Sequence, residues 1–336
     1  MNHKFAARTA LRGALALALA LSLSAGAWAL ELVPVGQAVG LEMRLEGVMV
    51  AGLAAEDQGG SPAGDAGVLP GDLIVSLDGE AVSSGEQLLQ GLANWDGGAM
   101  TLGLRRGEKE LRCEVTPEAG ENGAARLGLW LQDSVAGIGT VTFYDPESGL
   151  YAALGHGITD TDTGLLLPLQ EGVLVKSAVT AVRRGESGAP GALEGQPISQ
   201  EILGTIEENS FWGIFGKLYA PPEGGEPLTL AAVGEVHAGD AEILCNVSGT
   251  QVERFQVRIT QVSGISDDCR DLQLQVTDPA LLEKTGGIVQ GMSGSPILQD
   301  GKLVGAVTHV LIGDPTRGFG ILAEHMLSKA RELQAA

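Results

Sequence analysis

The chain has 336 residues, of which 50 are glycine and only 4% are aromatic. This length predicts two domains, and the glycine-rich, aromatic-poor composition favours many short strands joined by turns. The 42 acidic and 21 basic residues give a formal net charge of -21, which argues against nucleic acid or an anionic membrane surface as the main partner.

The N-terminal segment has the layout of a secretory signal peptide. Lys4, Arg8 and Arg12 precede an apolar run over 14–25, and Ala27-Trp28-Ala29 offers small residues at a cleavage site. The run is also long enough to serve as an uncleaved membrane anchor. We therefore expect an exported protein that is either secreted or anchored, with residues 1–29 as the part that would contact a membrane.

A small α+β module is predicted over residues 30–116. A capping box at Ser83-Ser84-Gly85-Glu86 begins a helical run over 87–95, among several short strands. The segment from Ser61 to Gly79 resembles the bacterial PDZ domain. Upstream, Val39, Gly40 and Leu41 resemble the PDZ loop whose backbone N–H groups bind a peptide carboxylate.

Residues 117–125, rich in Gly, Glu and Ala, are predicted to be a linker, and residues 126–336 a second domain. A hairpin signal at Asp145-Pro146-Glu147-Ser148-Gly149 separates two strand-like segments, and the second delivers His156 at its end. Later alternating segments and a closing helix over 322–333 indicate a β-barrel or sandwich that ends in a helix.

The segment Gly291-Met292-Ser293-Gly294-Ser295-Pro296 holds a serine between glycines, with apolar segments on both sides. Such a turn exposes a hydroxyl for attack and leaves neighbouring N–H groups free to bind an oxyanion. We predict Ser293 as the nucleophile and the N–H groups of Gly291 and Ser293 as the oxyanion donors. Ser295 is the rival nucleophile, and a serine that only satisfies a turn is the structural alternative.

A serine nucleophile requires a base, and His156 in Leu154-Gly155-His156-Gly157-Ile158 is the upstream candidate. We interpret His309, on the strand after the nucleophile, as a residue that packs or lines the pocket. His237 and His325 have no chemical constellation around them in the sequence. For the acid that orients the base, Asp278, Asp160 and Asp162 all remain open.

Cys113, Cys245 and Cys269 are an odd number, so a full disulfide framework is excluded. A single Cys245–Cys269 bridge and three partly buried thiols are both compatible with the sequence. None of the three has metal-ligand spacing or lies beside a histidine, so we expect no metal and no cofactor.

Two blocks, Leu154 to Asp160 and Gly286 to Ile297, together with the strand Gly305 to Val310, are similar to the SpoIVB peptidase family, the S55 serine peptidases. The resemblance implies a mainly β protein in which an N-terminal PDZ module precedes a trypsin-like β-barrel peptidase domain. It also implies His156, Asp278 and Ser293 as the catalytic set. Met292 stands where trypsin-like enzymes carry an aspartate, so activation by a buried N-terminal ammonium is not available.

The resemblance further implies a role in endospore formation. A member of this family is exported into the space between the forespore and mother-cell membranes, processes itself, and cleaves a membrane-bound regulator. That cleavage leads to activation of the late mother-cell sigma factor. Two alternatives remain at this stage: a non-catalytic PDZ scaffold, and an envelope quality-control protease, in which the PDZ module usually follows the catalytic domain.

Overall fold

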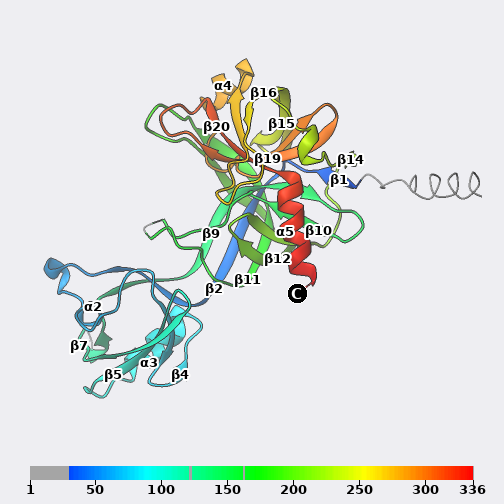
Figure 1. The fold of residues 1–336 in the computed structure, drawn as a ribbon. Helices are drawn as coiled ribbons and strands as arrows, with labels where there is room; N and C mark the ends of the chain where they lie inside the picture. Colours follow the sequence, from blue (N-terminus) through cyan, green and yellow to red (C-terminus); the bar gives the residue numbers. More distant parts are fainter. Residues whose placement is uncertain (1–29, 121–122, 162, 336) are drawn as a thin grey trace, which may run out of the picture. The chain divides into compact units, whose positions relative to one another are not determined.

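The computed structural model describes residues 30–120, 123–161 and 163–335, and its regular structure is mostly β-strand (Figure 1). The mainly β class predicted from the sequence is therefore confirmed. The expected signal peptide or anchor, residues 1–29, lies outside the described residues. Within the described part of the chain, no helix is long and apolar enough to cross a bilayer.

Six antiparallel strands form a first barrel. Their order around it is β2-β9-β10-β13-β12-β11, and pairing of β9 with β2 closes the ring. Branched and aromatic side chains such as Leu41, Tyr151 and Leu174 fill its interior. The strands span Ala38–Leu53 (β2), Leu129–Tyr144 (β9), Leu150–Ala153 (β10), Leu169–Arg183 (β11), Ala192–Ser210 (β12) and Gly213–Leu218 (β13).

A second closed barrel follows, with the order β15-β16-β17-β20-β19-β18. In both barrels the first three strands run around the ring in chain order and the last three return in reverse, so the two share one topology. Its core contains Ile243, Leu274 and Val307, all almost fully buried. The strands span Gly239–Ser248 (β15), Gln251–Val262 (β16), Leu272–Val276 (β17), Pro296–Gln299 (β18), Lys302–Val310 (β19) and Arg317–Leu322 (β20).

The predicted PDZ module lies between β2 and β9 in the sequence, and it has its own core around Ile74, Leu88 and Leu102. Ser84 caps the helix α3 by accepting a hydrogen bond from the Gln87 N–H, one residue later than the predicted box of Ser83 with Glu86, and the helix begins at Gly85 instead of residue 87. The elements span Glu56–Gln58 (η1), Pro62–Asp65 (α2), Leu73–Leu77 (β3), Glu80–Ala81 (β4), Gly85–Ala93 (α3), Met100–Arg106 (β5) and Lys109–Val115 (β6).

The strand β2 serves both folds, which corrects the predicted start of the PDZ module at residue 30. Its first half pairs with β11 and β9 of the first barrel, and its second half pairs with β3 at Val48 and Met49. The PDZ module is thus an insertion between two adjacent barrel strands. The prediction that Val39, Gly40 and Leu41 form a carboxylate-binding loop is wrong, because all three belong to the strand β2 and pair with β11 on one side and β9 on the other.

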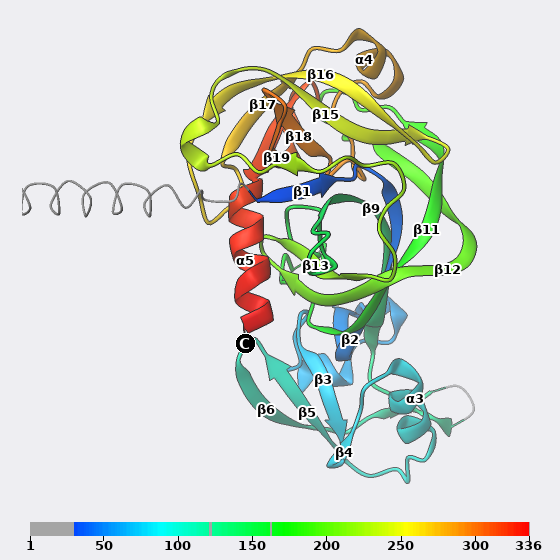
Figure 2. The same ribbon diagram turned by 90° about the vertical axis from the view of Figure 1, so that its right-hand side faces the viewer.

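The remaining elements are short, apart from the closing helix. The predicted linker 117–125 contains one strand of a small ladder, since β7 (Glu118–Ala119) pairs with β8 (Ala125–Arg126). Figure 2 shows the closing helix, α5 (Ala323–Ala335), beginning at the second barrel and running along the first. The others are β1 (Glu31–Pro34), β14 (Leu228–Thr229), η3 (Val233–Glu235) and α4 (Pro279–Thr285).

All three cysteines are free and buried, so the Cys245–Cys269 bridge does not form. Burial raises the pKa of Cys269 to about 12 and raises the pKa of Cys245 still further. These thiols are therefore protonated at neutral pH and unreactive as nucleophiles.

Candidate active site

The predicted base and nucleophile lie on corresponding loops of the two barrels. His156 is in the loop between β10 and β11, the third and fourth strands of the first barrel. Ser293 is in the loop between β17 and β18, the third and fourth strands of the second. Because the two barrels share a topology, this placement brings two sequence-distant residues to equivalent positions in the fold.

The backbone before His156 is held in an unusual conformation. Leu154 and Gly155 both have positive φ, at 67° and 71°. A non-glycine residue in this region carries strain that the surrounding packing must offset. A Cβ on Gly155 would lie 2.9 Å from the Thr308 methyl group of the second barrel. The loop that carries His156 therefore packs directly against the strand β19.

The ring of His156 is fixed by a local hydrogen bond. Its Nδ1 lies 2.9 Å from the carbonyl oxygen of Gly157. A carbonyl can only accept, so Nδ1 carries the proton and Nε2 keeps the lone pair that a general base needs. Burial lowers the pKa of His156, and the Gly157 carbonyl acts in the opposite sense. The imidazole is thus neutral and able to take a proton at neutral pH.

The turn around Ser293 leaves two backbone donors free. Gly291 and Gly294 have φ of 94° and 96°, a region that glycine adopts without strain. A Cβ on Gly294 would lie 2.0 Å from the Thr140 carbonyl oxygen, so no larger residue fits there. Within the described residues, the N–H groups of Gly291 and Ser293 donate to no acceptor. Free N–H groups at these two positions are what an oxyanion hole requires.

The Ser293 hydroxyl donates a hydrogen bond to the carbonyl oxygen of Thr308, at 2.8 Å. No hydrogen bond joins Ser293 to His156 in the part of the chain that the structure describes. The two loops are nevertheless adjacent, because a Cβ on Gly294 would lie only 2.6 Å from the Leu154 nitrogen. The arrangement is therefore a resting one, in which the hydroxyl must turn from Thr308 towards the imidazole before it can be activated.

Three further residues near the candidate nucleophile and base are Ser295, Met292 and His309. Ser295, the rival nucleophile, is fully buried and cannot reach a substrate. Met292 is also fully buried and packs in the core of the second barrel. The ring of His309 lies 5.1 Å from that of His156, centroid to centroid. Burial and the nearby His156 lower the pKa of His309 to about 4, so His309 is a neutral neighbour of the base at neutral pH.

Asp278 caps the helix α4. Its carboxylate accepts hydrogen bonds from the N–H groups of Ala280, Leu281 and Gln256. No hydrogen bond joins Asp278 to His156 among the residues described, so its role as the acid stays a prediction without a contact to support it. Asp160, the alternative, is occupied by the N–H and hydroxyl of Thr163. Asp162 lies outside the described residues.

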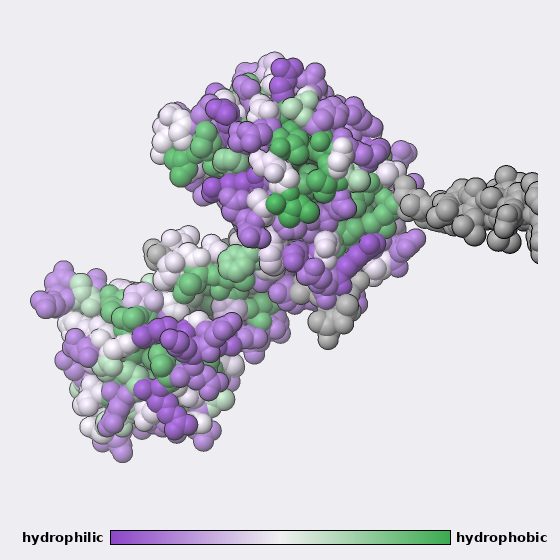
Figure 3. All heavy atoms as spheres, viewed as in Figure 1, coloured by the Kyte–Doolittle hydropathy of each residue, from purple (hydrophilic) through white to green (hydrophobic). Residues whose placement is uncertain are grey.

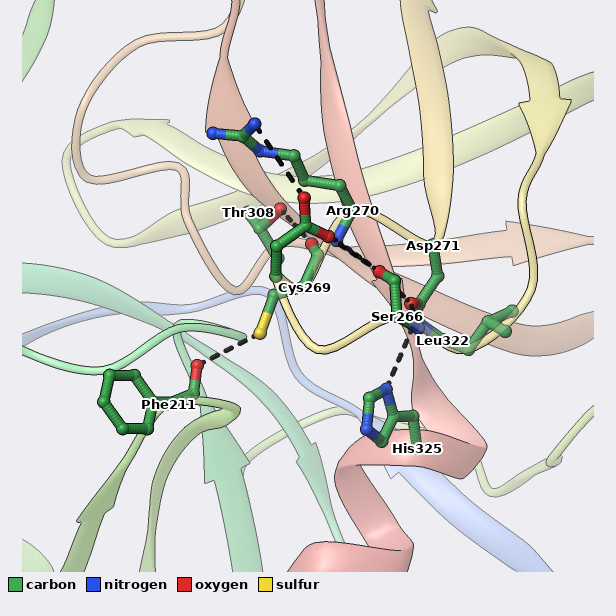
Figure 4. A network of polar contacts seen from close by, with 9 residues as sticks. Phe211, Ser266, Cys269, Arg270, Asp271, Thr308, Leu322 and His325 are labelled. Carbon is green, nitrogen blue, oxygen red and sulfur yellow. Dashed lines mark hydrogen bonds and ion pairs between the residues drawn. The ribbon is translucent and has the colours of Figure 1, made fainter.

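A polar network links Thr308 of β19, whose carbonyl holds the Ser293 hydroxyl, to α5 and to the first barrel (Figure 4). The Thr308 hydroxyl donates to the carbonyl of Cys269, at 3.0 Å, and the Cys269 thiol donates to the carbonyl of Phe211, at 3.0 Å. Asp271, on the same loop as Cys269, accepts from His325 of α5 at 3.2 Å. His325, which had no predicted role, therefore anchors the closing helix.

The PDZ part has a groove of about 390 Å³ between α3 and the start of β9. The groove is lined by Leu89 and Trp130, whose side chains are 62% and 57% exposed. On the molecular face shown in Figure 3, hydrophobic groups are interspersed with hydrophilic ones. Within the described chain, the N–H groups of Leu127 and Gly128, directly before β9, have no acceptor. These two N–H groups and the apolar lining are suited to an extended peptide with a terminal carboxylate.

Sequence reasoning missed this groove and placed its loop at Val39. The available signal was Leu127-Gly128-Leu129, a glycine between two apolar residues just before a strand. Gly128 has φ of 68°, and a Cβ there would lie 2.4 Å from the Gly60 carbonyl oxygen, which explains the glycine.

The comparisons with known proteins agree with this architecture. Residues 123–327 match the family model described as SpoIVB peptidase S55, and residues 58–106 match a PDZ domain model. No curated protein gives a significant match.

Two solved structures are similar to parts of the chain. The PDZ domain of an SdrC-like protein from Listeria monocytogenes is 24% identical, covers 26% of this chain and 87% of its own, and has a TM-score of 0.22. Rv3671c from M. tuberculosis H37Rv, solved as a serine-to-alanine mutant in an inactive form, is 16% identical. It covers 60% of this chain and 83% of its own, with a TM-score of 0.34.

Proposed function

Because this chain belongs to the SpoIVB peptidase S55 family and is a serine peptidase with a PDZ domain, we propose that it is an exported endopeptidase of endospore formation. Ser293 is the proposed nucleophile and His156 the base. The observation that carries this assignment is the pair of free N–H groups at Gly291 and Ser293, next to the loop that holds a neutral imidazole.

The proposed reaction proceeds through an acyl-enzyme. The Ser293 hydroxyl turns from the Thr308 carbonyl, gives its proton to His156 Nε2 and attacks the scissile carbonyl carbon. The resulting oxyanion accepts hydrogen bonds from Gly291 and Ser293. His156 then protonates the leaving amine. In the second half of the reaction His156 takes a proton from water, the water oxygen attacks the ester carbonyl carbon, and His156 returns the proton to the Ser293 oxygen as it leaves. Family resemblance assigns the acid to Asp278, but in the resting arrangement the Gly157 carbonyl makes the orienting contact.

The proposed substrates are the protein itself and a membrane-bound regulator whose cleavage activates the late mother-cell sigma factor. The proposed site of action is the space between the forespore and mother-cell membranes. The signal-peptide pattern of residues 1–29 and membership of the family support this placement. The alternative of an envelope quality-control protease is less well supported, because the PDZ module here is inserted between barrel strands instead of following the catalytic domain.

We propose that the groove between α3 and β9 binds an extended peptide from a substrate or from a second copy of the chain. A Leu89→Glu variant tests this, because Leu89 lines the groove and is largely exposed. We expect at least tenfold weaker binding of a labelled peptide with an apolar C-terminus, and thermal stability unchanged, since exposed substitutions cost little. Unchanged peptide affinity would exclude the groove as the binding site.

The central experiment compares wild-type and Ser293→Ala protein. We expect self-cleavage and peptide hydrolysis to fall on the order of 10⁶-fold if the catalytic residues act as a unit. N-terminal sequencing of the fragments from both proteins reports self-processing sites and removal of residues 1–29 together. Labelling by a fluorophosphonate should require Ser293. Self-processing retained in purified Ser293→Ala protein would refute the assignment.

A further inference from the structure

Thr140 of β9 is the one residue in the described structure that hydrogen-bonds to both catalytic loops. Its side chain is almost fully buried. Its N–H donates to the Ser293 carbonyl at 3.1 Å, and its hydroxyl donates to the Gly291 carbonyl at 2.8 Å. Its own carbonyl accepts from the Leu154 N–H, at 3.2 Å, at the start of the loop that carries His156. Thr140 therefore connects the nucleophile loop to the base loop.

The hydroxyl contact acts on the peptide unit between the two proposed oxyanion donors. This unit consists of the Gly291 carbonyl and the Met292 N–H. The carbonyl is held by the Thr140 hydroxyl, and the Met292 N–H donates to the Val289 carbonyl at 3.1 Å. With both ends held, the plane of this peptide is fixed. This peptide joins the two residues whose φ and ψ angles set the relative directions of the Gly291 and Ser293 N–H groups, so holding it helps to keep both groups directed at one oxygen.

Without the Thr140 hydroxyl, the carbonyl end of this peptide would have no hydrogen bond among the described residues, and only the Met292 end would be held. Gly291 has a φ of 94° and no side chain, so rotation about its backbone bonds is easy. A buried carbonyl without a donor also costs free energy, which favours a rotation that gives it a new hydrogen-bond donor. We propose that Thr140 is a positioning residue for the oxyanion hole. This inference rests on the proposed assignment of Ser293 as the nucleophile.

The chain offers a matched control two residues along the same strand. Thr142 is fully buried, and its hydroxyl has no hydrogen-bond partner within the described residues. Replacing either threonine by valine keeps the shape and removes one hydroxyl. Thr140→Val removes a donor from the nucleophile loop, whereas Thr142→Val removes a hydroxyl that holds nothing. Thr140→Ser keeps the donor and removes only a methyl group.

The test measures kcat and KM for a peptide substrate, per active site titrated with a fluorophosphonate, and the affinity for a peptide boronate. The boronate forms a tetrahedral adduct and so reports on the oxyanion hole. Losing an oxyanion donor outright costs 10²–10³-fold in kcat, so we expect Thr140→Val to lower kcat about 10- to 100-fold. KM should stay within about threefold, and boronate affinity should fall by the same factor as kcat/KM. Thr140→Ser should restore kcat to within about threefold, and Thr142→Val should remain near wild type.

Three results would overturn the inference: unchanged kcat in Thr140→Val even with lowered thermal stability, failure of Thr140→Ser to restore kcat, or an equal loss in Thr142→Val. If Thr140→Val does not fold, Thr140→Cys makes the same comparison, because a thiol is a weaker donor than a hydroxyl. Failure of the proposed function is distinguishable, since either wild type would then hydrolyse no peptide or Ser293→Ala would remain active, whatever the Thr140 variants do.

Discussion

The buried carboxylate of Asp271 holds α5 to the second barrel, and its replacement by asparagine tests how strongly (Figure 4). Oδ1 accepts from the Ser266 N–H at 2.7 Å and from the Ser266 hydroxyl at 2.9 Å. Oδ2 accepts from the Leu322 N–H at 2.9 Å and from His325 Nδ1 at 3.2 Å. In Asp271→Asn, one of these oxygens becomes an NH₂ donor.

The magnitude follows from the donors that lose an acceptor. In the better orientation the NH₂ faces Ser266, whose hydroxyl can rotate to accept, so only the Ser266 N–H is left unpaired. A buried donor without an acceptor costs about 1–3 kcal/mol, and we expect the free energy of unfolding to fall by that amount. In Asp271→Ala all four donors lose their acceptor, so the free energy of unfolding should fall by more than in Asp271→Asn.

The assay is urea unfolding at pH 7 in a Ser293→Ala background, so that the proposed self-cleavage would not interfere with the measurement. Tryptophan fluorescence reports the transition, because the ring of Trp212 lies 6.2 Å from that of His325. The matched control is Asp300→Asn, which alters an exposed pair in which His237 lies 2.9 Å from Asp300. That change should cost less than about 0.5 kcal/mol. An equal fall in the free energy of unfolding in Asp271→Asn and Asp300→Asn would refute the reasoning.

The pH dependence of the free energy of unfolding gives a second measure of the Asp271 contacts. Burial opposes the charge of Asp271, but hydrogen bonds from His325, Leu322 and Ser266 outweigh it and lower the pKa below its ordinary 3.8. The stabilisation is therefore fully present above that value and is lost as the pH falls through the lower folded-state pKa. The difference in the free energy of unfolding between wild type and Asp271→Asn should become smaller below about pH 4.

Two further predictions concern catalysis. Because burial lowers the pKa of His156, the acidic limb of kcat/KM should have its midpoint below pH 6.5, with activity lost as the pH falls through it; a midpoint above 6.5 in a pH–rate profile would contradict this. Asp278→Ser keeps a helix-capping oxygen but removes the carboxylate, so from the observed capping we expect kcat within about tenfold of wild type and stability within a few tenths of a kcal/mol. A fall in kcat on the order of 10⁴-fold would instead restore Asp278 as the acid.

The sequence predicted the parts of the site that depend on local backbone geometry. The glycines around Ser293 and before His156 occupy left-handed or crowded positions, and such requirements can be read from the chain. Asp278 shows the opposite case. An aspartate directly before Pro279 is also a helix-start signal, and the carboxylate is used in that way here.

The contacts that depend on the path of the chain could not be predicted. Nothing local marks β2 as a strand shared by two folds, so its first half was assigned to the PDZ module. The β9 side of the groove follows the PDZ helix and strands in the sequence, so no residue upstream of the motif marks it. The partners of Thr140 and Asp271 are far away in the sequence and are fixed only when the barrels close.

Insertion of the PDZ module between β2 and β9 determines what the proposed self-cleavage would produce. A single cut anywhere in 54–128 would leave β2 on one fragment and β9 on the other. The two would still be hydrogen-bonded as neighbouring strands of one barrel. The nicked protein would then migrate as two bands on a denaturing gel while eluting as an intact particle from a sizing column. A chain beginning at residue 126, by contrast, lacks β2 and leaves the edges of β9 and β11 open to aggregation.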